Sequence, residues 1–567
     1  MERRATPQSI VITTVLSFAI AMAVLVPRTA PGLTFEDAGE LASAAVVLGV
    51  PHPPGYPLWT LLGHLVVRLG SIFEIDPARA LTLLSAVAAG CCCAGLAAFV
   101  RSRGASSLVA IGAGLVPLAS ATFLSQALIV EVYALASAFQ AWLLFAALGS
   151  TPRPRTAWLL LGLGLAAHPA SLLLAPLAPI ATWRARVSGA IRPPALVQQA
   201  LGLLAGLALY LYVPWSASRD PAMNWGSPTG GKRLLDHWLR RQYAGGGDVP
   251  FAPRLEFAAE QLVGAWVWLI APLLVLALLG AGRVVHGCGL RRWLLLVVAV
   301  ASVGGFVALP FDLTPEILRY RVAATYLPAV LAIAAFAGLG LAALEALLRS
   351  RIDRSLAALL AAIPLGLAFV PGASVLSGAT DQSANVAATR YATETLDACP
   401  DDAILVVSRL GYTDVLSFPL VYGQIVLGER PDVTVIDRST LAIDWYREQL
   451  ATRAPDLASA IERMSATFQA EPGRYSDPRQ ARLATIPFLR ELFEGSRPVV
   501  MVERPGPQVL GDFEPTPGRS LWWINRQAPD ADTDSTCWPW LAEAQRSPWT
   551  ELLNELARSR EAALAAR

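Results

Sequence analysis

The chain has 567 residues, of which 54% are hydrophobic and only 16% are charged, and its mean hydropathy is +0.48. A soluble globular protein of this length needs charged residues at roughly a quarter of its positions, so a wholly soluble class is excluded. The net charge of +2, with basic residues scattered at helix ends, argues against a nucleic-acid partner.

The first 371 residues repeat one pattern, in which apolar stretches alternate with short basic loops. This pattern predicts a polytopic α-helical membrane protein followed by a soluble tail. The first apolar run is about 20 residues long and no convincing cleavage site follows it, so we interpret it as an uncleaved first span. Cys91, Cys92 and Cys93 lie inside an apolar helix and are interpreted as packing residues.

Lys and Arg in the short loops set the expected orientation, because cytoplasmic loops carry an excess of them. The segment 57–70 is short and carries a polar stripe, so we expect an interfacial amphipathic helix there and not a crossing. With the N-terminus inside and the C-terminus outside, every basic cytoplasmic loop falls on one side. We then expect about eleven spans, near 10–30, 80–100, 105–123, 127–149, 156–168, 170–183, 195–213, 260–281, 293–310, 323–347 and 355–371.

The tail differs in pattern from the part that precedes it. Short Val- and Ile-rich runs at 403–408, 433–437 and 497–503 are typical of buried strands, and helical patterns lie between them. We therefore expect a membrane domain over 1–374, with its first extracytoplasmic loop at 31–79, and an extracytoplasmic α/β domain over 375–567. If this tail is extracytoplasmic, Cys399 and Cys537 can pair.

The first outer loop, "TFEDAGELASAAVVLGVPHPPGYP", concentrates acidic residues directly after a span. A helix here places Glu40 on one face with Asp37 and with Glu36. This face can supply a general base, alone or with a divalent cation; the alternative is a helix cap with solvated charges. Prolines hold the backbone around His52, which can face a phosphate or a hydroxyl; the alternative is a stiff connector.

Further polar residues are expected on the same membrane face. Glu131, Tyr133 and His168 lie at span ends, where a structural ion pair and a catalytic role are both open. Basic outer loops can bind a phosphate or, alternatively, anionic lipid headgroups. Their candidate residues are Arg219 and Trp225 in 214–243, a loop that ends in "RRQY", and Arg319 and Arg321 in 311–321.

These motifs together resemble the transmembrane protein 260-like family. The resemblance rests on "EDAGELASAAVVLGVPHPPGYPLW", "VEVYAL", "GLGLAAHPA", "NWGSP" with "RRQY", and "LVYGQIVLGERPDVTVI", which follow the family order across most of the chain. It implies a fold of the GT-C glycosyltransferase superfamily. It also implies that Asp37 is the catalytic carboxylate, and that Glu40, His52 and Glu131 occupy motif positions.

From the resemblance we expect an enzyme that transfers a sugar, mannose by family analogy, from a polyprenyl-phosphate donor. The expected acceptor is an extracytoplasmic protein hydroxyl or a glycan. From the Ala- and Arg-rich composition, and not from the resemblance, we expect a bacterial inner membrane. Asp37 would act as the base, while Arg319, Arg321 and His52 would stabilise the leaving phosphate. Two other classes stay open: a transporter or flippase of lipid-linked sugars, and a non-catalytic membrane assembly protein.

Overall fold

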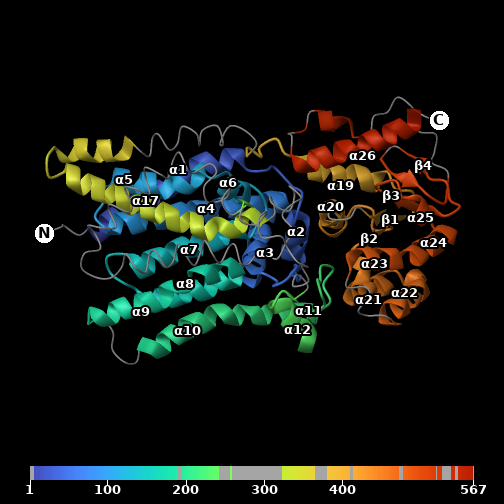
Figure 1. Cartoon of the computed structure of the whole chain (residues 1–567), viewed down its shortest axis with the longest axis horizontal. Coiled ribbons are helices and arrows are strands. Elements are labelled where there is room, and N and C mark those ends of the chain that lie inside the picture. The colour runs from blue at the N-terminus through green and yellow to red at the C-terminus, as the bar shows by residue number, and fades with distance from the viewer. Residues whose placement is uncertain are drawn as a thin grey trace.

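The structure is a computed structural model, and it describes most of the chain. Its described residues are 5–189, 195–241, 256–257, 322–363, 380–408, 413–470, 477–518, 520–526, 538–542, 544 and 547–565. Figure 1 shows a long bundle of helices on one side and an α/β region, drawn in orange and red, on the other. The N-terminus lies at the end of the bundle farthest from that α/β region.

Within the described residues, four helical segments are long and apolar enough to cross a membrane: Pro7–Arg28, Pro77–Ser102, Leu196–Ala217 and Ala324–Leu348. They match four of the expected spans, which confirms a polytopic helical membrane fold. The expected spans at 260–281 and 293–310 lie outside the described residues, as does part of 355–371, so the count of eleven stays a prediction. The main helices here are α1 (Pro7–Leu25), α4 (Pro77–Ser102), α10 (Ala195–Leu207), α11 (Tyr212–Ala217) and α17 (Leu327–Leu348).

The segment 57–70 forms α3 (Pro57–Ser71), as expected, and starts at a proline. Its 15 residues extend about 22 Å at about 1.5 Å per residue, which is shorter than the hydrocarbon core of about 30 Å. Leu65 and Leu69 on its outer side are exposed, while Thr60 on its inner side is buried. This length and this pattern of exposed and buried side chains fit a helix that lies along the membrane interface.

The expected straight span at 105–123 is broken in the structure. Instead α5 (Ser107–Leu115) and a 3-10 turn (Val116–Ala119) are followed by α6 (Ala121–Ala127), at an angle of 83°. Pro117 has no amide hydrogen to continue the helix. Ser120 then takes an extended backbone, and its Oγ accepts the Phe123 N–H and caps α6. Hydropathy alone carries no sign of such a bend.

The next helices are α7 (Tyr133–Leu148), α8 (Pro154–Ala167) and α9 (Leu177–Val187), and α8 and α9 are separated by a 3-10 turn, Pro169–Leu174. The break that we expected at His168–Pro169 is confirmed, because α8 ends at Ala167 and His168 has an extended backbone. This break leaves the His168 side chain at the end of a helix, where it can turn toward neighbouring elements.

The C-terminal region holds a five-stranded sheet in the order β2-β1-β3-β5-β4. The three predicted strands are confirmed as β1 (Ile404–Val407), β2 (Thr434–Asp437) and β3 (Val499–Met501), and they pair in parallel. Strands β4 (Thr516–Pro517) and β5 (Trp522–Trp523) pair antiparallel. The helices are α19 (Ala387–Asp397), α20 (Thr413–Ile425), α21 (Asp444–Arg453), α22 (Ala458–Ala470), α23 (Pro478–Ala484), α24 (Ile486–Glu494), α25 (Pro507–Leu510) and α26 (Pro548–Ala565). Cys399 is a buried free thiol, and Cys537 lies outside the described residues.

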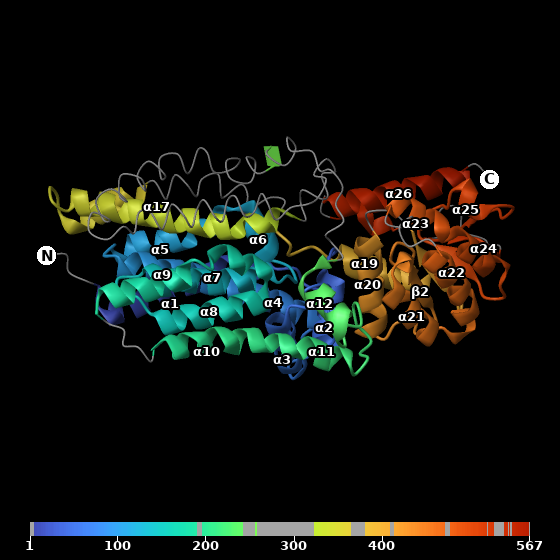
Figure 2. The same ribbon diagram turned by 60° about the horizontal axis from the view of Figure 1, so that its bottom comes forward.

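The two parts meet at α2 (Ala38–Val47), which packs against α20. The approach is close: a Cβ atom at Gly39 would lie 2.3 Å from the carbonyl oxygen of Phe418. A second contact between the two parts joins α12 (Gly231–Trp238) to α21. Here Arg233 donates two hydrogen bonds to Glu448, at 2.7 and 2.9 Å. Figures 1 and 2 show α2, α11 and α12 at the end of the bundle that faces the C-terminal region.

Candidate active site

Asp37 lies at the start of α2, in the position of a helix cap, but its side chain makes no capping hydrogen bond. Glu36 directly before it has a left-handed backbone, with φ of 69°, which turns the chain into the helix. The Asp37 side chain is 38% exposed. Asp37 therefore does not cap the helix through its side chain. Its carboxylate is partly exposed to solvent, and Oδ2 faces the His52 ring.

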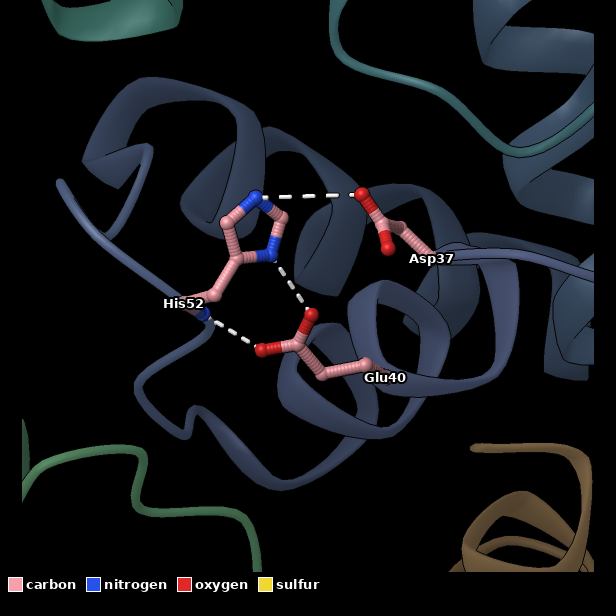
Figure 3. A group of neighbouring side chains, drawn as sticks. All are labelled: Asp37, Glu40 and His52. Carbon is pink, nitrogen blue, oxygen red and sulfur yellow. Dashed lines mark hydrogen bonds and ion pairs between the residues drawn. The ribbon is translucent and has the colours of Figure 1, made fainter. Parts of the chain in front are cut away.

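Glu40, one turn further along α2, is completely buried, and its partner is His52 (Figure 3). Oε2 of Glu40 lies 2.7 Å from Nδ1 of His52, and Oε1 accepts the His52 backbone N–H. Nε2 of the same ring lies 3.8 Å from Oδ2 of Asp37. The turn of residues 51–55 thus brings the imidazole back between the two carboxylates, so His52 is no incidental part of a connector.

The carboxylates of Glu40 and Asp37 stabilise a positive charge on His52. Burial lowers the pKa of His52, but the carboxylates of Glu40 and Asp37 outweigh it and raise this pKa to about 9. Burial also raises the pKa of Glu40, against the opposing effect of His52. An imidazolium that donates from Nδ1 to Glu40 satisfies the buried carboxylate, so we assign the shared proton to His52.

An aromatic layer supports the imidazole from the side of the bundle. The Tyr56 hydroxyl lies 2.8 Å from Nε2 of His52, and the Tyr56 ring stacks on His168, with 5.5 Å between centroids and 9° between planes. The Tyr133 ring also contacts His168, with 4.4 Å between the ring centroids. The predicted residues Tyr133 and His168 are therefore brought to His52, through a tyrosine that the sequence reading did not single out.

His168 presents a hydrogen-bond donor inside this layer. Its Nδ1 accepts the Ala170 N–H at 3.0 Å, which leaves the ring hydrogen on Nε2 when the ring is neutral. Among the residues that the structure describes, the buried Nε2 has no partner. The alternative of a structural ion pair between His168 and another span finds no support in the described part of the chain.

Glu131 sits between α6 and α7 and is buried. Its backbone is fixed to two other helices: the carbonyl accepts from Trp59 of α3 at 3.1 Å and from Ser85 of α4 at 3.2 Å. The Val132 N–H donates to its carboxylate at 3.0 Å, and electrostatic interactions link it to Asp37. No Arg or His ion pair reaches this carboxylate within the described ranges.

The basic residues of the outer loops differ in their position relative to His52. Arg240, the first residue of "RRQY", is close enough to interact electrostatically with His52 and Tyr133, whereas Arg219 lies over the Trp215 ring at 4.8 Å. The Trp225 ring lies 6.5 Å from the His52 ring. Arg319 and Arg321 lie outside the described residues, so their place beside Asp37 stays a prediction.

Asp37, Glu40 and His52 also offer three ligand atoms within 4.8 Å of one another, which is close enough for a metal ion. A metal-bound histidine nitrogen must be neutral. Nδ1 of His52 already bonds to Glu40 at 2.7 Å, so Nε2 is the ring nitrogen left to face a cation. As placed, Glu40 and His52 contact each other directly, and a cation bound here would compete with this hydrogen bond.

Comparisons with known proteins test the family resemblance of the chain. The sequence pattern of the Protein O-mannosyl-transferase TMEM260 N-terminal domain matches residues 37–188, and that of TMEM260-associated domain 2 matches residues 388–473. The predicted family resemblance is confirmed. Asp37 is the first residue of the matched N-terminal domain, and the second match covers the C-terminal region that packs on α2.

A curated relative extends the match. The Protein O-mannosyl-transferase TMEM260 of Mus musculus is 27% identical over 467 residues, which cover 77% of this chain and 64% of that protein. The chain thus spans less than two thirds of the length of this relative. Its described activity is that of the mouse protein, and it bears on this chain only as a proposal.

Solved structures extend the likeness to the fold. The apo crystal structure of ArnT from Cupriavidus metallidurans is 13% identical, with a TM-score of 0.50, and the match covers 91% of this chain and 99% of that one. A second ArnT structure, bound to undecaprenyl phosphate, is 14% identical with a TM-score of 0.46, over 77% and 91% of the chains. The apo match shows that the two chains share an overall fold.

Proposed function

We propose that the chain is an inverting membrane glycosyltransferase. It would transfer a sugar, mannose by family analogy, from a polyprenyl-phosphate-linked donor to a hydroxyl group of an extracytoplasmic protein. The observation that carries this proposal is the Asp37 carboxylate, which is 38% exposed and lies 3.8 Å from the half-buried imidazole of His52. A solvent-facing carboxylate with a fixed orientation, at the end of a membrane bundle, suits a general base that meets a lipid-linked donor at the surface.

In the proposed reaction Asp37 accepts the proton of the acceptor hydroxyl. The hydroxyl oxygen attacks the anomeric carbon from the face opposite the phosphate, and the bond between that carbon and the phosphate oxygen breaks. The electron pair leaves on the polyprenyl phosphate, and Asp37 later releases its proton to water. One displacement inverts the anomeric centre. A positioned base contributes about 10²–10⁴-fold to such a step.

His52 and Glu40 serve this step as positioning residues. The imidazolium attracts the Asp37 carboxylate at 3.8 Å, and Glu40 holds the imidazole from the opposite side at 2.7 Å. This geometry favours a role in orienting Asp37 over the predicted direct contact of His52 with the phosphate. Trp225, 6.5 Å from His52, and Glu131 would border the space taken by the sugar.

The departing phosphate needs positive charge near the site. Arg240 is the described cation that acts on His52 and Tyr133, and Nε2 of His168 offers a neutral donor in the same layer. We propose that these groups, together with Arg319 and Arg321 as predicted from the sequence, bind the donor phosphate. We do not include Arg219 among the phosphate-binding residues, because its guanidinium lies over the Trp215 ring.

The proposed setting is a bacterial inner membrane, with the N-terminus in the cytoplasm and the α/β domain, residues 375–567, outside it. The N-terminus and the C-terminal region lie at opposite ends of the bundle (Figure 1), as this orientation requires. Glu40, His52 and Arg240 lie at the end that faces the α/β region. A site at one membrane face suits a transferase better than a transporter, whose substrate site lies near the bilayer midplane.

The test is transfer of radiolabelled mannose from polyprenyl-phosphate mannose to protein acceptors by the purified full chain in detergent. Asp37→Asn should insert and unfold like the wild type while transfer falls about 10²-fold or more. Near-normal turnover in that variant would remove Asp37 from the mechanism. No transfer by the wild-type chain, together with movement of the labelled lipid across a bilayer, would favour the transporter class instead.

A further inference from the structure

A groove lies beside the proposed active site, between the outer loop of the bundle and the C-terminal region. It is open to solvent on one side, and its volume is about 90 Å³. Aromatic rings dominate its walls: Trp225 comes from the outer loop, Phe418 from α20, and Trp445 and Tyr446 from α21. The Trp225 ring lies 5.2 Å from Trp445 and 5.9 Å from Phe418. Apart from Trp225, the proposed sugar transfer uses none of the residues that line this groove.

The backbone fixes the groove relative to the catalytic turn. Val50, two residues before His52, donates its N–H to the Met223 carbonyl at 2.8 Å, and its own carbonyl accepts the Trp225 N–H at 2.9 Å. From the other side, Gln449 of α21 donates to the Asn224 carbonyl at 2.6 Å. The segment 222–225 is thus held between the two parts of the molecule and forms a shared wall.

Trp225 connects the groove to the site, because its ring faces Trp445 on one side and lies 6.5 Å from the His52 ring. Successive residues of an extended chain are about 3.4 Å apart. A polypeptide with its hydroxyl at Asp37 would therefore place a side chain about two to four residues away into the groove.

The polar groups of the groove favour a peptide over a glycan. The Asp437 carboxylate already accepts from Ser417 and from two backbone N–H groups, and the Tyr446 hydroxyl oxygen accepts the Asp437 backbone N–H at 2.8 Å. Few polar atoms are left for the many hydroxyls of a sugar. Oδ1 of Asn224, which is 3% exposed, has no partner among the described residues and suits one peptide N–H.

We propose that this groove is the acceptor-recognition site, and that it binds an aromatic or large aliphatic side chain close to the hydroxyl residue that receives the sugar. The backbone of the acceptor donates one N–H to Asn224 Oδ1, and the apolar side chain lies among Trp225, Trp445 and Phe418. The proposal rests on the proposed transferase function, and it makes the C-terminal region a determinant of acceptor choice.

The experiment compares mannose transfer to synthetic Ser-containing peptides that carry one Trp or Leu at each position from −4 to +4, against an all-Gly/Ala background. Wild-type protein should prefer peptides with the apolar residue at one or two positions, through a lower KM. Trp445→Ala should lower kcat/KM for the preferred peptide about thirtyfold, the effect of losing one buried aromatic contact, and should abolish the preference. Leu483→Ala, an exposed residue of α23, is the matched control and should change neither.

A second measurement does not depend on Trp445→Ala folding. A peptide with a photoreactive phenylalanine at the preferred position should cross-link to residues 222–225 or to α21 in the wild-type chain. Equal transfer to all peptides would overturn the groove proposal while leaving the transferase intact. Competition and cross-linking by a soluble oligosaccharide instead of the peptide would also overturn it, in favour of a glycan. Transfer to no peptide and no glycan would contradict the proposed function itself.

Discussion

Nδ1 of His52 lies 2.7 Å from Oε2 of Glu40, a carboxylate that is completely buried. A buried carboxylate is costly unless it is paired and hydrogen-bonded, and His52 supplies both contacts through its ring and its backbone N–H. This pair fixes the imidazole, and the imidazole in turn faces Asp37 (Figure 3). Glu40 contacts His52, and His52 faces Asp37. We therefore expect substitutions of these three residues to lower transfer activity by different amounts.

Glu40→Gln should lower kcat by about 10-fold to 100-fold, the usual effect of removing a residue that orients a functional group. The loss should be smaller than that of Asp37→Asn, because the amide oxygen can still accept the His52 backbone N–H. Kinetics with saturating acceptor measure the difference. A total loss in Glu40→Gln with residual activity in Asp37→Asn would exchange the two roles.

The pH dependence follows from His52. Its pKa is raised from 6.5 to about 9, so the stability that its charge contributes is complete below about 6.5 and is lost as the pH rises through about 9. Transfer activity and thermal stability should both fall across this range. In His52→Gln this descending limb should disappear from the stability profile. A wild-type stability profile that stays flat from pH 7 to 10 would contradict a charged His52.

Arg240→Gln should raise KM for the polyprenyl-phosphate donor and lower kcat, together reducing kcat/KM about 10²-fold, as for other groups that stabilise developing charge. The neighbouring Arg241 serves as the control, because its side chain is 52% exposed and pairs with Asp236 at 2.9 Å. Arg241→Gln should have little effect. Equal losses in the two variants would mean that the loop needs positive charge in general and not Arg240 in particular.

Gly39→Ala should destabilise the contact between α2 and α20, because the added methyl group would lie 2.3 Å from the Phe418 carbonyl oxygen. We expect a lower melting temperature and reduced transfer, since the shift would also move Glu40. Gly230→Ala is a matched control, because no atom lies within 4 Å of the position of its new Cβ. Similar melting temperatures for Gly39→Ala and wild type would show that the contact relaxes easily.

Local patterns predicted much of this fold. Val-rich runs predicted β1, β2 and β3, the proline after His168 predicted the helix break, and the spacing of Asp37 and Glu40 predicted two carboxylates at the start of one helix. Each of these features depends on neighbours in the sequence. For the same reason the sequence alone predicts the polar group around Asp37.

Other features were not predicted, either because their local signal is common or because they depend on contacts between distant segments. The 83° turn between α5 and α6 depends on Pro117 and Ser120, but prolines and serines also occur in other apolar stretches of the sequence. Tyr56 contributes because of its place against His168, and Arg240 because an earlier part of its loop hydrogen-bonds to Val50 of the first outer loop. An aromatic after a Pro-Gly turn and the first arginine of "RRQY" were the available signals, and neither specifies its partner.

The contact between α2 and α20 has a consequence for how the protein can be divided. In the helix that carries Asp37 and Glu40, Gly39 packs directly against the backbone of Phe418 and Pro419 of α20. Tyr422 of α20 also donates a hydrogen bond to Asp76 at the start of α4, at 3.3 Å. Cutting the chain between its two parts would remove α20 from α2 and expose to solvent the face of α2 that packs against it. Neither half should therefore be studied as an independent enzyme or receptor, and engineered versions need to exchange both halves together.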